Sequence, residues 1–124
     1  GLAFSNTKTA IAHNLSYPIT LKYGIQHGIA CSFTLPIITR SMIGINKVAE
    51  RRLELIFNND LEESSTQLSN FMRELEVPLN LNEIKVPIQD WNNIVNDAFL
   101  GERGKNFIGN KDAFISSAKL MGFL

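Results

Sequence analysis

The chain has 124 residues, which is enough for one domain with a hydrophobic core but short for two. Apolar residues make up 44% and charged residues 19%, a mix typical of folded globular proteins and not of disordered ones. Twelve basic and twelve acidic side chains cancel and form no block of like charge. Binding to nucleic acid or to an anionic membrane surface is therefore disfavoured.

The single cysteine, Cys31, cannot form a disulfide within the chain and fits a reducing compartment. Its apolar surroundings favour a small core residue over a catalytic thiol, which needs a nearby base. No apolar run approaches the ~20 residues of a membrane-spanning helix. The N-terminus lacks the layout of a signal peptide, so a cytoplasmic protein is expected. The chain opens on Gly1 without a methionine, which suggests a piece of a longer polypeptide.

Helices are expected from one end of the chain to the other. The first is capped by residues 5–6 and ends ahead of Pro18, and residues 18–28 are irregular. Residues 29–45 are apolar on nearly all sides, which predicts a buried central helix that Pro36 kinks.

The next two helices are predicted from charge patterning and capping residues. Residues 47–57 alternate charged and apolar faces. Asp60, with Glu63 three residues later, resembles a capping box and opens a helix that Pro78 closes. Residues 79–86 are expected to form a loop.

The last third of the chain carries the clearest amphipathic stripe. Pro87 is a good first helical residue, and Gly101 ends the helix. Its apolar positions, spaced by three and four, are Ile88, Trp91, Ile94, Val95, Ala98 and Phe99. Asn110 opens a final helix that closes near Gly122. No period-two pattern longer than about four residues suggests a strand, so the predicted fold class is all-α.

Two histidines, His13 and His27, stand 14 residues apart. On one unbroken helix they would be ~21 Å apart along the axis, whereas a shared metal ion needs both ring nitrogens within ~2.0–2.2 Å of it. Pro18, Gly24 and Gly28 lie between them and allow the chain to reverse. Spacing alone favours two structural histidines over a metal pair.

Three short segments surround these histidines: GLAFSN at residues 1–6, Ala12-His13, and YGIQHGIA at residues 23–30. They resemble the iron-containing (group III) alcohol dehydrogenase family. There, a Gly-x-x-Phe-Ser-Asn segment precedes a ligand histidine, and a second ligand histidine follows in a His-Gly-hydrophobic-small context. Pro18 falls at the family's usual proline. The close match covers roughly residues 1–36.

The resemblance implies a two-domain enzyme that interconverts an alcohol and an aldehyde by hydride transfer. An N-terminal domain, absent from this chain, would bind NAD or NADP, and residues 1–124 would be the C-terminal part of a multi-helical, dehydroquinate synthase-like domain. The family holds Fe²⁺ or Zn²⁺ with one aspartate and three histidines, of which His13 and His27 match two. No cofactor-binding residue can be assigned, the chain alone is expected to be inactive, and a homodimer is the family expectation.

Three further residues are candidates for contact with substrate. Many family members have a proton-relay histidine four residues after the first ligand; Tyr17 stands there, either as a relay or as a packing residue. Arg103 and Lys105, in a charged segment near the family's substrate pocket, suit an anionic group such as a phosphonate or carboxylate. The alternative for that segment is a solvated loop. The alternatives for the whole chain are a standalone helical interaction domain with structural histidines and a small two-histidine metal-binding protein.

Overall fold

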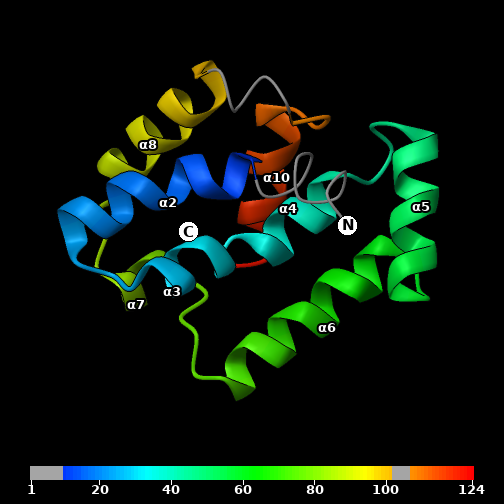
Figure 1. The fold of residues 1–124 in the computed structure, drawn as a ribbon, viewed down its shortest axis with the longest axis horizontal. Helices are drawn as coiled ribbons and strands as arrows, with labels where there is room; N and C mark the ends of the chain where they lie inside the picture. The colour runs from blue at the N-terminus through cyan, green and yellow to red at the C-terminus, as the bar shows by residue number, and fades with distance from the viewer. Residues whose placement is uncertain (1–9, 102–106) are drawn as a thin grey trace.

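A computed structural model describes residues 10–101 and 107–124. In these two stretches the regular secondary structure is helical, without a strand, which confirms the predicted all-α class (Figure 1). The helices are α2 (Ala10–Tyr23), α3 (His27–Ser32), α4 (Leu35–Ser41), α5 (Lys47–Phe57), α6 (Leu61–Glu74), α7 (Leu81–Ile84), α8 (Ile88–Leu100) and α10 (Lys111–Leu120). Among the described residues, no helix is long and apolar enough to cross a membrane.

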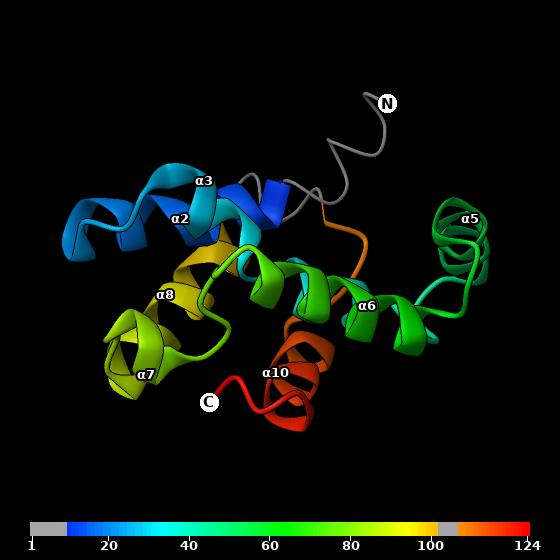
Figure 2. The same cartoon turned by 90° about the horizontal axis from the view of Figure 1, so that it is seen from below.

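The helices pack in two neighbouring groups. Helix α2 lies against α3 on one side and α8 on the other, and α4 packs on both α6 and α10 (Figures 1 and 2). Helix α5 contacts α6 at the far end of the molecule. Because α3 and α4 follow each other directly, they link the α2–α8 group to the α6–α10 group.

A cluster of aromatic rings fills the core between these groups. Phe33 stacks on Phe123 with ring centroids 5.4 Å apart, and Trp91 lies 4.9 Å from the Phe123 ring and 6.2 Å from Phe114. All four side chains are at most 2% exposed. Phe33 follows α3, so the core also anchors the end of this short helix.

Side-chain caps define several helix starts. Asp60 accepts a hydrogen bond from the amide of Glu63 at 2.7 Å, and Asn110 accepts one from Ala113 at 2.8 Å. Both capping residues were expected from the sequence, because short polar side chains satisfy amides that the first turn leaves without partners. Asn58 ends α5 in the left-handed conformation, with φ of 57°.

The first helix does not end before Pro18. It continues to Tyr23, so the predicted boundary is wrong. Proline removes the amide that would bond to the carbonyl of Asn14, and its ring crowds that carbonyl. Ile19, beyond the proline, is fully buried on the same stripe as Ile11 and Leu15, and this burial favours the continuous helix.

The apolar segment 29–45 also differs from its prediction. It is not one kinked helix but two short ones, α3 and α4, with Pro36 in the first turn of α4. Proline fits there because the first-turn amides need no partner within the helix. The expected loop 79–86 contains the short helix α7, and Pro87 stands one position before α8 as its N-cap. Helix α6 ends at Glu74, four residues ahead of Pro78.

Candidate metal centre

His13 lies on α2, on the side that faces α3. Its neighbour Ala12 is 1% exposed and belongs to the core, whereas His13 itself is partly buried. Tyr17, one helical turn further along, has its ring centroid 6.4 Å from that of His13. The core stripe of α2 thus holds the helix in place while these two rings stand at its edge.

A three-residue turn brings the chain back beside α2. Gly24 adopts a φ of +67°, a conformation that glycine reaches without steric cost, and its amide bonds to the carbonyl of Thr20 at 3.1 Å. Helix α3 begins at His27 and packs along α2. The expected chain reversal is therefore present. Gly28 takes no part, since it has no positive φ and no neighbouring atom within 4 Å of where a Cβ would be.

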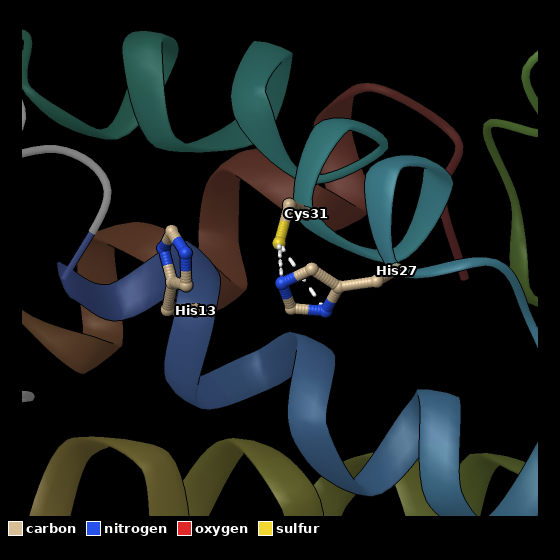
Figure 3. Close-up of side chains that lie close together, drawn as sticks. All are labelled: His13, His27 and Cys31. Atoms are coloured by element: carbon tan, nitrogen blue, oxygen red, sulfur yellow. Dashed lines mark hydrogen bonds between the residues drawn. The ribbon is translucent and has the colours of Figure 1, made fainter.

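The reversal places His13 and His27 edge to face. Their ring centroids are 5.7 Å apart, with an interplanar angle of 63°. Cys31, one turn after His27 on α3, has its Sγ atom 3.5 Å from His27 Nε2 and 3.9 Å from Nδ1. One ligand atom from each of the three residues lies within 4.8 Å of the other two, and Figure 3 shows the three side chains directed toward one another.

This donor set fits a transition-metal ion. Two imidazole nitrogens bound to one tetrahedral ion at ~2.0–2.1 Å would be about 3.4 Å apart. The ligand atoms of this cluster lie within 4.8 Å of one another, so an ion would draw them closer together. His27 is exposed and His13 is partly buried, so an ion would be reached from solvent. Imidazole ligands suit both iron and zinc.

The other candidate residues differ in where they lie relative to the histidine pair. The Tyr17 ring stacks on His27, with centroids 5.9 Å apart and an angle of 29°, and is 44% exposed. It therefore stands beside the histidine pair. Arg103 and Lys105 lie outside the described residues. Cys31 was expected in the core, but it is only partly buried. Cys31 follows His27 by four residues, and this spacing is the sequence signal that places both side chains on one face of a helix.

Two carboxylates, Asp60 and Asp90, make structural contacts. Asp60 caps α6. Asp90, on α8, accepts hydrogen bonds from Lys22, at 2.8 Å, and from the hydroxyl of Tyr23. The hydrogen bond from Lys22 is the main cause that lowers the pKa of Asp90, with that from Tyr23 second. The same bonds to Asp90 raise the pKa of Lys22 and of Tyr23. This cluster connects the end of α2 to the start of α8.

Comparison with protein families finds a match over most of the chain. The model of the Fe-containing alcohol dehydrogenase family, C-terminal, matches residues 1–113. No curated protein and no solved structure matches the chain. The match includes α2 and α3, and so both histidines of the candidate centre.

Proposed function

Because the chain belongs to the Fe-containing alcohol dehydrogenase family, in the C-terminal part of that family, we propose that it supplies metal ligands to an NAD(P)-dependent alcohol dehydrogenase. The observation that carries the proposal is the approach of His13 and His27 to 5.7 Å between ring centroids across the turn between α2 and α3. Both side chains lie within the segment that matches the family. His13 and His27 hold the ion, and the remaining aspartate and histidine of the family's ligand set come from outside the described residues.

The bound ion would act as a Lewis acid on the substrate oxygen, stabilising an alkoxide or polarising a carbonyl. The task of this chain is to hold the two imidazoles at fixed positions. The core stripe of α2 fixes His13, and the packing of α3 along α2 fixes His27. NAD(P) is bound by a separate N-terminal domain in this proposal.

Tyr17 is the proposed hydrogen-bond donor to the substrate oxygen. Its ring packs on His27, so its hydroxyl lies on a side chain that is itself held beside the centre. Tyr17→Phe keeps the ring stack and removes the hydroxyl. The change is expected to lower kcat and leave the metal content unchanged, because it removes no ligand.

Arg103 and Lys105 are the proposed contacts for an anionic substrate. The support is their chemistry alone: a guanidinium fork and an ammonium suit carboxylate or phosphonate oxygens. Arg103→Ala is expected to raise KM for an anionic aldehyde much more than for a neutral one. Equal effects on both substrates would contradict this assignment.

The metal proposal is tested in the complete natural protein that carries this sequence. His13→Ala and His27→Ala should each remove NAD(P)-dependent alcohol oxidation. Each should also lower metal affinity by at least about tenfold, because loss of a residue that only supports a ligand already costs that much. Gln26→Ala is the control, because Gln26 is exposed beside His27 and its side chain makes no cap hydrogen bond. Unchanged metal content in both histidine variants would contradict the proposal and favour structural histidines.

A further inference from the structure

Cys31 is the one residue of the candidate centre that the family resemblance does not assign. Its Sγ atom lies 3.5 Å from His27 Nε2, and its ligand atom is within 4.8 Å of those of both histidines. It is partly buried at the α2–α3 interface and is not packed in the core. A core role therefore does not account for its position.

The spacing of Cys31 is that of a paired ligand. Residues four apart on a helix lie on the same face, one turn above the other, so His27 and Cys31 can reach one ion from α3 while His13 reaches it from α2. Figure 3 shows the sulfur directed at the His27 ring, at the edge of that ring that is nearer to His13. Three donors on two helices thus lie within 4.8 Å of one another.

We propose that Cys31 Sγ is a third protein ligand, contributed by this chain, to the ion that His13 and His27 hold. The inference rests on the proposed metal site and adds a donor to it. On binding, the thiol loses its proton to solvent and a sulfur–metal bond forms, with no change in oxidation state. Thiolate and imidazole donors both suit zinc, so the centre should prefer Zn²⁺ to ions that favour oxygen ligands, such as Mg²⁺.

The alternative role for Cys31 is a thiol that only hydrogen-bonds to His27 and holds its ring. This also fits the 3.5 Å separation. The two roles differ in a measurable way, because only a ligand forms a bond to the metal. A spectroscopic signature of the sulfur–metal bond therefore separates them, whereas activity would not.

The experiment uses the complete natural protein, freed of metal and titrated with Co²⁺, in the wild type and in Cys31→Ser, Cys31→His and Ser32→Ala. The wild type should show a near-ultraviolet thiolate-to-cobalt charge-transfer band together with visible d–d bands. Cys31→Ser should lose the charge-transfer band and bind Co²⁺ and Zn²⁺ at least about tenfold more weakly. Ser32→Ala, a control at the next position, should keep the band.

Cys31→His supplies a nitrogen donor at the same position, so it should lose the band but bind metal more tightly than Cys31→Ser. Circular dichroism confirms that each variant is folded, and in the wild type bound Zn²⁺ should protect Cys31 from alkylation.

Two outcomes overturn the inference in distinguishable ways. If wild-type protein shows d–d bands without a charge-transfer band and Cys31→Ser binds metal equally well, then Cys31 is not a ligand, while the histidine site stands. If the wild type binds no Co²⁺ or Zn²⁺ at all, the proposed metal site fails and the inference about Cys31 fails with it.

Discussion

The side-chain amide of Asn14 donates a hydrogen bond to the backbone oxygen of Ala98, 3.1 Å away and 84 positions further along the chain. Ala98 lies in the last turn of α8, where carbonyl groups have no partner within the helix. Asn14 is the neighbour of His13, so this bond ties the turn of α2 that carries the histidine to α8. The position of His13 therefore depends on a contact outside the centre itself.

Replacing Asn14 by alanine should lower the free energy of unfolding by about 0.5–1.5 kcal/mol, the usual net value of one such hydrogen bond. Asn93→Ala is the matched control, because it makes the same change at an exposed position on α8 and so includes the same gain in helix propensity. Urea unfolding of both variants measures the difference. Equal stabilities for the two would show that the bond to Ala98 contributes nothing.

The glycines on either side of His27 should respond oppositely to alanine. Gly24→Ala forces a side chain into a left-handed turn, at a cost of roughly 1–2 kcal/mol, since φ there is +67°. Gly28→Ala lies inside α3 with no atom within 4 Å of the added Cβ, so it should stabilise by up to ~1 kcal/mol. Thermal unfolding measures both changes. A stabilising Gly24→Ala would mean that the turn is not built as described.

The all-α class and several helix ends could be predicted because they depend on local chemistry. Asp60 and Asn110 cap helices with their own side chains, and Gly101 ends α8, all as the sequence indicates. The reversal between the two histidines could be anticipated from the glycine at position 24, which is where the turn forms. These features can be predicted without knowing which segments pack against them.

The wrong predictions for Pro18 and Cys31 have a common physical origin, which is packing between distant segments. Pro18 locally favours a helix end, but the burial of Ile19 against the rest of the core outweighs the lost hydrogen bond and the crowding of the preceding turn by the ring. Cys31 was assigned to the core from its apolar neighbours, yet its side chain lies on the face of α3 that meets α2. Which face of a short helix is covered depends on the partner helix, which local patterns do not specify.

Gly109 is expected to tolerate no side chain. A Cβ there would clash with the Phe107 ring, 2.7 Å from its Cζ atom, and would lie 3.3 Å from Met42 Sδ. Phe107 is only 6% exposed and packs edge to face on Phe99, so the ring has little room to move. Gly109→Ala should therefore destabilise by roughly 1–3 kcal/mol, the range for overpacking.

The double variant Gly109→Ala/Phe107→Leu tests this cause, because a smaller side chain at 107 removes the clash. Its loss of stability in urea unfolding should be smaller than the sum of the two single losses. If the loss of stability in the double variant equalled the sum of the two single losses, the role assigned to Phe107 would be contradicted.

The cluster of Lys22, Tyr23 and Asp90 should make stability depend on pH at both ends of the scale. The pKa of Asp90 is lowered from 3.8, mainly by its hydrogen bond from Lys22, so its contribution is present above 3.8 and is lost as pH falls through the folded-state pKa. The hydrogen bonds to Asp90 raise the pKa of Lys22 from 10.5 and that of Tyr23 from 10.0. Their contributions are present below those values and are lost as pH rises through the raised ones.

Asp90→Asn should consequently lower stability by a constant amount between about pH 4 and pH 10, and the difference from wild type should shrink outside that window. Urea unfolding measured across the pH range gives both curves. Lys22→Met should remove most of the same acid-side dependence, because the bond from Lys22 is the largest cause of the Asp90 shift, while Tyr23→Phe should remove less. Wild-type and Asp90→Asn curves that stay parallel through the acid range would show that Asp90 does not hold α2 and α8 together through its charge.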